Sequence, residues 1–397
     1  MRGALPAGSA PHNPARGARP PAQIRVRQLG GSDYIPAMPF DAAPASPATL
    51  ARLRPRTVAW WLLSVAGLVW IMVAIGGATR LTGSGLSIME WAPLSGTLPP
   101  LSEAEWQRLY DLYRTVPQYA LLNAGFGMEG FKQIFWLEWL HRFWGRLIGL
   151  AYLLPFLWLW ARGAIPRALM PRLWLLFALG GLQGAIGWFM VASGFQADRT
   201  AVSPYRLVLH LSMAFLLFGL LLWTALGLLR PAPEALPAPA EAARGKVRRQ
   251  VQWAFWLAAT TMLAGGFVAG TRAGFTFNTF PLMDGRLFPA GYLDAVPLWT
   301  NLTENLAAVQ FNHRLLATLT GLAAVGVGVA AWRHLPPGFA RSAAVVMAAA
   351  VLGQYALGVL TLLYVVPVPL GTLHQTVAVG VLAAGLCAWH GLRAPPT

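Results

Sequence analysis

Seven histidines and one cysteine decide which metal chemistry this chain of 397 residues can support. Because Cys387 is the only cysteine, a monomer can build no intramolecular disulfide and no cysteine-based zinc or iron–sulfur site. Any metal must therefore bind to histidine. Four histidines fall inside long apolar stretches: His141, His210, His313 and His374. The other three fall in the N-terminal tail or at the ends of apolar stretches, where we expect them to face water or headgroups: His12, His334 and His390.

The four intramembrane histidines belong to a repeat that divides the chain into two halves. The motifs recur in the same order, as Gly76-Gly77 with Gly265-Gly266, His141-Arg142 with His313-Arg314, Gln183 and Gly187 with Gln354 and Gly358, and Leu209-His210 with Leu373-His374. Four short matches in register are not expected by chance. Each half therefore contributes two histidines, and we expect the repeated glycines of the 172–192 and 341–365 stretches to allow close helix packing.

All four histidines lie near the outer ends of their apolar stretches. At a rise of 1.5 Å per residue, each imidazole is expected roughly 10 Å below the outer membrane surface. Two histidines at equal depth on different helices of a four-helix unit suit axial ligation of an iron porphyrin, with one nitrogen from each side. A lone histidine more often forms a hydrogen bond between helices, so the duplication is what favours haem ligation.

The two histidine pairs have different neighbours. Glu138 precedes His141 by three residues, which places the carboxylate and the imidazole on one helix face, whereas the second half has Gln310 at this position. This asymmetry predicts chemistry in the first half and electron storage in the second. The alternative for Glu138 is a charge at a helix start, favoured by the dipole. Arg142 and Arg314 either bind haem propionates or extend to the outer interface, and the sequence leaves both open.

The composition shows which elements must position these residues. Hydrophobic residues make up 56% of the chain and charged residues 11%, against about 25% in soluble proteins. The chain is therefore predicted to be an all-α integral membrane protein. Eight stretches are long enough to cross a hydrocarbon core, at about 57–78, 139–161, 172–192, 204–229, 251–270, 306–332, 341–365 and 370–392.

The charges predict the topology. Most of the 30 Lys and Arg fall in the two termini and in alternate connections, while the intervening loops hold most carboxylates. By the positive-inside rule, both termini are cytoplasmic and the large acidic loops are outside. The net charge of +16 is thus explained by topology and by contact with anionic membrane lipid, and nucleic acid is not expected as a partner.

The spans and the repeat together predict four regions. Residues 1–56 form a disordered cytoplasmic tail, 57–230 an N-terminal four-helix half with the first histidine pair, 231–250 a cytoplasmic linker, and 251–392 a C-terminal four-helix half with the second histidine pair. Since each half has an even number of spans, the fold class is two parallel-repeat four-helix bundles, with a partly ordered outer loop. Prolines in the tail oppose the amphipathic helix of a transit peptide, which favours the bacterial inner membrane over the mitochondrial inner membrane.

The chain from about residue 57 to 392 resembles the haem A synthases of proteobacteria and mitochondria, which serve cytochrome oxidase assembly. The stretches that carry the resemblance are Gly76-Gly77-Ala78-Thr79-Arg80-Leu81-Thr82-Gly83-Ser84-Gly85-Leu86-Ser87, Glu138-Trp139-Leu140-His141-Arg142, Phe311-Asn312-His313-Arg314 and Leu373-His374-Gln375. Some bacterial members have a cysteine pair in the first outer loop. This chain has none there, which argues against a thiol role.

The resemblance implies an oxidoreductase and its ligands. The substrate haem o would be held by His141 and His210, with Glu138 needed for catalysis, and a haem b cofactor would be held by His313 and His374. The reaction would convert a peripheral methyl of haem o to the formyl group of haem a by successive oxidations. A haem o synthase is a candidate partner, and the electron donor leaves no readable mark.

Two questions stay open at the level of sequence. Ligation by two histidines leaves no open iron position for O2, so either one ligand leaves during turnover or water attacks the oxidised methyl. Our hypothesis is that Glu138 manages protons or stabilises a developing cation at that methyl. The competing functions are a bis-haem b-type cytochrome that passes electrons from quinol and, less well supported, a transporter built from repeats.

Overall fold

The computed structural model describes residues 53–196 and 199–394. Of the tail predicted over 1–56, residues 1–52 lie outside the described residues, and the first helix already begins at Pro55. Within the described part of the chain, eight helices are long and apolar enough to cross a membrane, which confirms the predicted number of spans. They are α2 (Pro55–Leu81), α4 (Gly127–Ala161), α5 (Met170–Ala192), α6 (Pro204–Leu229), α7 (Ala238–Thr271), α8 (Leu306–His334), α9 (Phe339–Leu363) and α10 (Val368–Gly391).

Two helices begin well before the spans predicted for them. α7 starts at Ala238, inside the predicted linker, because its alanines favour helix and a proline in the first turn lacks only a hydrogen-bond donor that a helix start leaves unused. α4 starts at Gly127, so Glu138 lies about three turns inside the helix. A favourable interaction with the dipole at a helix start therefore does not explain Glu138, because that effect is confined to the first turn.

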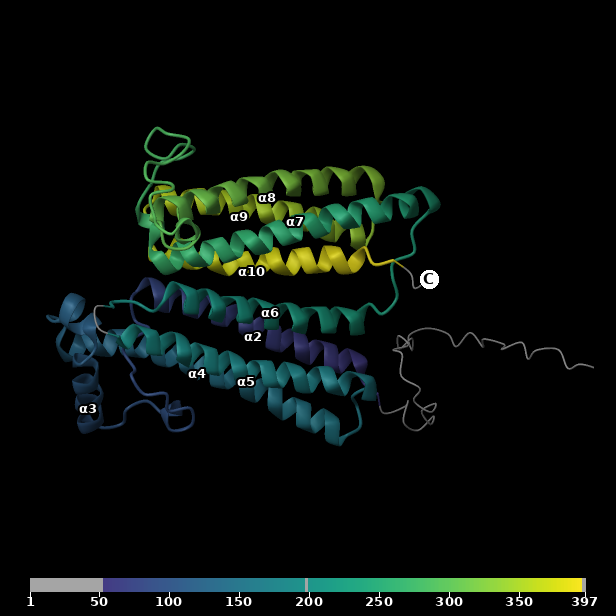
Figure 1. The fold of residues 1–397 in the computed structure, drawn as a ribbon. Coiled ribbons are helices and arrows are strands. Elements are labelled where there is room, and N and C mark those ends of the chain that lie inside the picture. The colour runs from purple at the N-terminus through teal and green to yellow at the C-terminus, as the bar shows by residue number, and fades with distance from the viewer. Residues whose placement is uncertain (1–52, 197–198, 395–397) are drawn as a thin grey trace, which may run out of the picture. The chain divides into compact units, whose positions relative to one another are not determined.

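The helices of each half contact one another, and three pairs join the halves. In Figure 1, α2, α4, α5 and α6 form one layer and α7 to α10 the other. Across the boundary, α2 packs against α10, and α6 packs against α7 and α10. Two hydrogen bonds cross there as well: Trp70 Nε1 donates to the Thr376 carbonyl over 2.7 Å, and Arg80 Nη2 donates to the Ala269 carbonyl over 3.0 Å.

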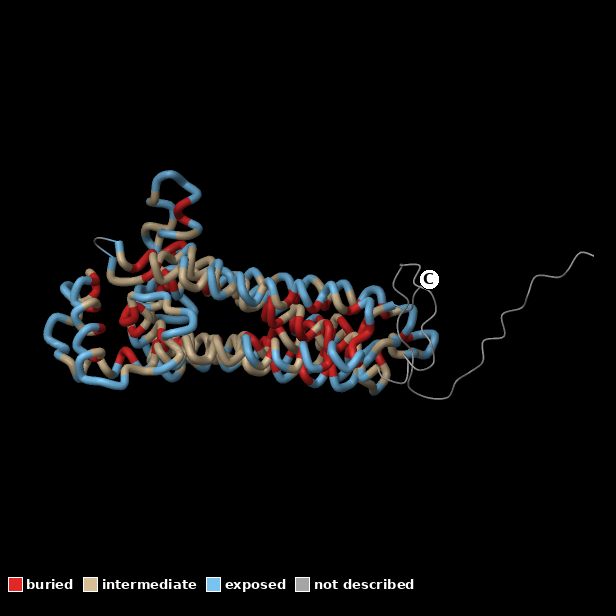
Figure 2. Tube along the Cα trace, turned by 90° about the horizontal axis from the view of Figure 1, so that it is seen from below, coloured by how far each residue is buried: buried red, intermediate tan, exposed pale blue. Residues whose placement is uncertain are grey.

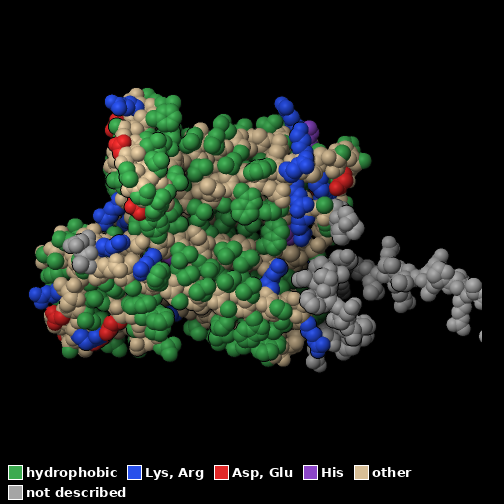
Figure 3. All heavy atoms as spheres, in the orientation of Figure 1, with side chains coloured by type: hydrophobic (Ala, Val, Ile, Leu, Met, Phe, Trp, Pro, Cys, Tyr) green, Lys and Arg blue, Asp and Glu red, His purple; other side chains and the backbone are tan. Residues whose placement is uncertain are grey.

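The surface has the pattern of a membrane-spanning protein. Figure 3 shows hydrophobic side chains over the middle of the visible face and charged side chains gathered at its two ends. Large apolar side chains on the membrane-spanning helices are exposed, among them Trp60, Trp253 and Leu322, at 62%, 72% and 66% exposure. In water such a surface would aggregate, whereas in a bilayer it faces lipid tails.

The apolar core does not fill the helices evenly. Figure 2 shows buried residues toward the end of the helices that carries the C-terminus and again at the opposite, outer end, with half-buried residues between them. The larger core cluster includes Leu62, Phe156, Leu173, Phe218 and Met347. All four histidines are half-buried, as is every residue from 141 to 148.

The segment between α2 and α4 contains a helix of its own. Its helix α3 (Glu103–Arg114) starts at Ser102, whose hydroxyl accepts a hydrogen bond from the Glu105 amide. Trp106 of α3 contacts Phe135 of α4 edge to face, with ring centroids 4.8 Å apart. This aromatic packing holds α3 against the N-terminal part of α4.

Candidate functional site

Each of the four intramembrane histidines lies against a glycine of the neighbouring helix. A Cβ built on Gly76 of α2 would lie 3.1 Å from His141 Nε2, and one on Gly265 of α7 would lie 3.0 Å from His313 Cε1. Any side chain larger than hydrogen at these positions would displace the ring. At these positions the glycines allow the imidazole ring to pack closely against the backbone of the neighbouring helix.

The second histidine of each half repeats this contact. A Cβ on Gly187 of α5 would lie 2.9 Å from His210 Cε1, and a Cβ on Gly358 of α9 would lie 2.9 Å from His374 Cε1. The same histidine–glycine contact therefore occurs four times, twice in each half.

Within each half, the two histidines lie near one another. His141 and His210 are within electrostatic range of one another, and so are His313 and His374. No group of three His, Cys, Asp or Glu side chains converges on a possible metal position anywhere in the described residues. Metal ligation by the paired rings therefore needs further ligands that come from a bound group, such as the four nitrogens of a porphyrin.

Glu138 is buried, and its hydrogen bonds are all made with the loop that follows α2 and with Arg142. Its Oε2 accepts from the amide and hydroxyl of Ser87, each over 2.7 Å, and from the amide of Ile88 over 3.0 Å. Its Oε1 pairs with Arg142 over 2.7 Å. Four donors hold this carboxylate in one orientation.

Arg142 and Arg314 each hold the backbone of the loop that follows the first helix of their half. Arg142 donates to the carbonyls of Ile88 and Glu90, each over 2.6 Å, and Arg314 donates to the carbonyls of Phe277 and Thr279 over 2.6 and 2.8 Å. The two acceptors are two residues apart in both loops. The sequence suggested propionate contact or extension to the interface, and it gave no sign of this backbone clamp.

The second half replaces the carboxylate with an amide in the same framework. Gln310 Nε2 donates to the Phe277 carbonyl over 3.0 Å, and Arg314 binds the same oxygen. The Gln310 Oε1 and the Arg314 Nε are buried and have no partner among the described residues. The Arg314 Nε is therefore left available to an anionic group, whereas the Arg142 Nε is taken by Glu138 over 3.0 Å.

Helix α3 is linked to Glu138 through Glu90 and Arg142. Arg108 of α3 donates to both oxygens of Glu90 over 2.9 and 2.8 Å and also to Glu105. The hydrogen bonds from Arg108 lower the pKa of both carboxyls below their usual range. Since these side chains are exposed, the pairs add little stability, and their role is to link α3 to the loop that Arg142 holds.

Two glutamines of the repeat also contact the histidines. Gln183 Nε2 lies 3.2 Å from His210 Nδ1 and donates to the His210 carbonyl over 3.1 Å. Gln354 Nε2 donates to the His374 carbonyl over 2.8 Å. The repeat showed these glutamines, but their contact with the histidines depends on how α5 and α9 face α6 and α10.

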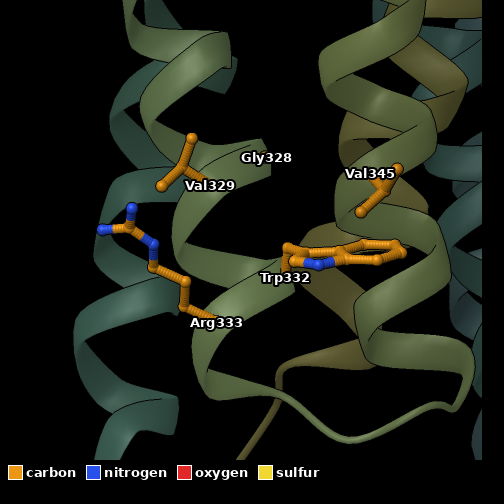
Figure 4. A pocket seen from close by; sticks show the side chains of 5 residues that line it. All are labelled: Gly328, Val329, Trp332, Arg333 and Val345. Carbon is orange, nitrogen blue, oxygen red and sulfur yellow. The ribbon is translucent and has the colours of Figure 1, made fainter.

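A surface recess on α8 and α9 lies apart from all of these residues. Figure 4 shows Trp332 and Val345 facing each other across it, with Arg333 on the other side of α8. Trp332 and Arg333 occupy the last turn of α8, more than four turns from His313. An apolar recess beside an exposed tryptophan at a helix end is typical of a lipid-facing surface.

The clamp by arginine can be tested by proteolysis. Arg314→Lys keeps the charge, but a lysine ammonium does not reproduce the forked pair of bonds to Phe277 and Thr279. Loss of one bond to a charged group costs about 1.5–3 kcal/mol, so we expect the 272–305 loop to be cut at least about tenfold faster in limited proteolysis. Arg341→Lys, at a residue that lies over the Trp332 ring, is the control. Equal cleavage of both variants would contradict the clamp.

Known proteins resemble this chain over almost its entire membrane part. Residues 59–386 match a family model described as cytochrome oxidase assembly protein. The chain is 56% identical over 336 residues to the Heme A synthase of Granulibacter bethesdensis, covering 85% of this chain and 87% of that protein. It is 51% identical over 357 residues to the Heme A synthase of Rhodospirillum centenum, covering 89% and 93%. The matched region runs from the first span to the last.

Proposed function

Because the chain belongs to the cytochrome oxidase assembly family and, like its haem A synthase relatives, converts haem o to haem a, we propose that its two halves divide this task. The first half holds the substrate haem o between His141 and His210. The second half holds a haem b cofactor between His313 and His374. In this proposal the fold is two four-helix bundles related as parallel repeats, over 57–230 and 251–392. The segment 231–250, which includes the first turns of α7, lies on the cytoplasmic side.

One observation carries the proposal: the histidine–glycine contact that occurs at both histidines of both halves. An iron ligand needs a ring held in one orientation, with an unprotonated nitrogen. The glycine contacts restrict the ring, and the half-buried surroundings of all four histidines leave them outside the packed apolar core. The buried Nδ1 of His374 also has no partner among the described residues. These residues fit a haem in each half.

The difference between Glu138 and Gln310 assigns the roles of the halves. Each oxidation on the way from a methyl to a formyl group breaks a C–H bond at that carbon, so a group that accepts protons or balances positive charge is suited to the substrate half. Glu138 is the buried carboxylate that fits this need, three residues before His141. A haem b in the second half supplies one-electron redox chemistry, and a neutral Gln310 is sufficient there.

The surroundings of Glu138 support a positioned carboxylate. Ser87, Ile88 and Arg142 fix its orientation and balance its charge, so the carboxylate does not have to reorganise during the reaction. Arg142 and Arg314 hold the loops that border the two sites. The free Nε of Arg314 is suited to a propionate of the second haem.

The membrane setting follows from the same proposal. The chain is a multi-pass membrane protein, and the bacterial origin of its relatives supports the cell membrane as its location. With both termini cytoplasmic, the histidines and the cap over α4 face the outer side. Haem o, itself a membrane-soluble molecule, then reaches the first half from the bilayer, delivered by a haem o synthase.

Pigment identification tests this function. We expect the purified chain, expressed together with a haem o synthase, to contain haem b and either haem o or haem a. Replacing His374 with alanine should remove haem b and stop haem a formation, while haem o remains bound. Replacing His210 with alanine should remove haem o and leave haem b. Two haem b groups in the unmodified chain under these conditions would instead indicate an electron-transfer cytochrome.

A further inference from the structure

Gln183 and Gln354 make the same contact in the two halves. Each amide nitrogen donates to the backbone carbonyl of the second histidine, His210 over 3.1 Å and His374 over 2.8 Å. Each glutamine also lies four residues before the glycine that touches the same imidazole, Gly187 or Gly358. Residues four apart share a helix face, so one face of α5 and one of α9 hold the histidine through both residues.

The side-chain oxygen of each glutamine accepts no hydrogen bond from the described residues. The Oε1 atoms of Gln183 and Gln354 are buried and have no hydrogen-bond partner among the described residues, and the same is true of His374 Nδ1. A buried polar atom without a partner costs about 1–3 kcal/mol. In contrast, His313 Nδ1 lies 3.1 Å from the Thr261 carbonyl, which is a ready acceptor.

Iron binding changes the hydrogen-bond requirement of the histidine ring. An imidazole that binds iron through Nε2 carries its proton on Nδ1, and this N–H group requires an acceptor. Gln183 already places its terminal amide 3.2 Å from His210 Nδ1, with the nitrogen nearest. Rotation of this amide by half a turn exchanges its nitrogen and oxygen. It brings the unused Oε1 to the same place and gives up the bond from Nε2 to the His210 carbonyl.

We propose that Gln183 and Gln354 accept a hydrogen bond from Nδ1 of His210 and His374 when these histidines bind haem iron. The inference rests on the proposed function and adds to it the residues that set the basicity of one ligand in each half. For Gln354, the repeat and the two unpartnered atoms support the same geometry. A stronger acceptor makes the imidazole more electron-donating, which stabilises ferric over ferrous iron and lowers the midpoint potential. Both glutamines are therefore positioning residues, because they act through the histidines.

Two substitutions of Gln354 with opposite expected signs test this role. Gln354→Leu removes the acceptor, and we expect the haem in the second half to become easier to reduce, by about tenfold in the ferrous-to-ferric ratio at fixed potential, or about 59 mV for one electron. Gln354→Glu supplies a stronger acceptor and should shift the potential the other way. The measurement is a redox titration of the purified full-length protein, with the low-spin electron paramagnetic resonance signal recorded alongside.

Thr361→Val on the same helix is the matched control, since Thr361 donates to the Leu357 carbonyl within α9, and we expect no shift. A glutamine that served only in packing would give shifts of the same sign in both Gln354 variants, or none, and either result would overturn the inference. Protein that carries haem with an unchanged potential leaves the proposed function standing, whereas protein without haem in any variant refutes both. Gln183→Leu and Gln183→Glu repeat the comparison in the haem o half.

Discussion

Replacing Glu138 with glutamine is expected to lower haem a formation by about 10²-fold or more, while both haems stay bound. The amide oxygen of a glutamine still accepts from the Ser87 and Ile88 amides, and Arg142 keeps its two loop carbonyls. The loop should therefore keep its place, and only the negative charge and its capacity to accept a proton are lost. The measurement is the ratio of haem a to haem o in extracts of cells that also contain a haem o synthase.

Glu138→Ala is a less specific variant of the same experiment. It leaves the Arg142 Nε and the Ser87 amide without partners, and removal of one member of a buried ion pair costs about 3–5 kcal/mol. Glu129→Gln is the control, because Glu129 lies on the same helix with its side chain 84% exposed. If Glu138→Gln loses its pigment together with its activity, the carboxylate is structural. If activity persists, the charge is not needed for the reaction.

Adding a single methyl group at Gly358 is expected to remove haem from the second half, and at Gly187 from the first. In each case the new Cβ would lie 2.9 Å from a histidine Cε1, closer than carbon atoms approach, so the ring must move away from its position. We expect a loss of haem affinity of at least about tenfold, measured as pigment retained per protein after purification.

The chain offers a control on each of the same two helices. Gly353 lies on α9 and Gly184 on α5, and a Cβ at either position meets no atom within 4 Å. Gly353→Ala and Gly184→Ala should keep their pigment, because alanine is a better helix former than glycine. Pigment loss in all four variants would show that these helices tolerate no added methyl group, and the specific contact with histidine would lose its support.

The number of spans and the candidate ligands could be predicted because both are encoded locally. Twenty apolar residues in a row are sufficient to identify a span, and α2 and α6 begin within two residues of their predicted positions. The start of α4 was predicted twelve residues late, since the polar first turns of α4 project beyond the hydrophobic stretch. Hydropathy marks where a helix crosses the lipid, and it does not mark where the helix begins.

The sequence by itself determined the repeat, the four intramembrane histidines and the difference between Glu138 and Gln310, because a duplicated motif can be recognised by comparing one half with the other. Only the tertiary structure decided that Glu138 pairs with Ser87, that Arg314 clamps Phe277, and that Gln354 holds His374. These partners are between 20 and 51 residues apart. Their contacts depend on the path of the outer loops and on the rotation of each helix about its axis, and the membrane-spanning stretches, apolar on all sides, carry no pattern that fixes that rotation.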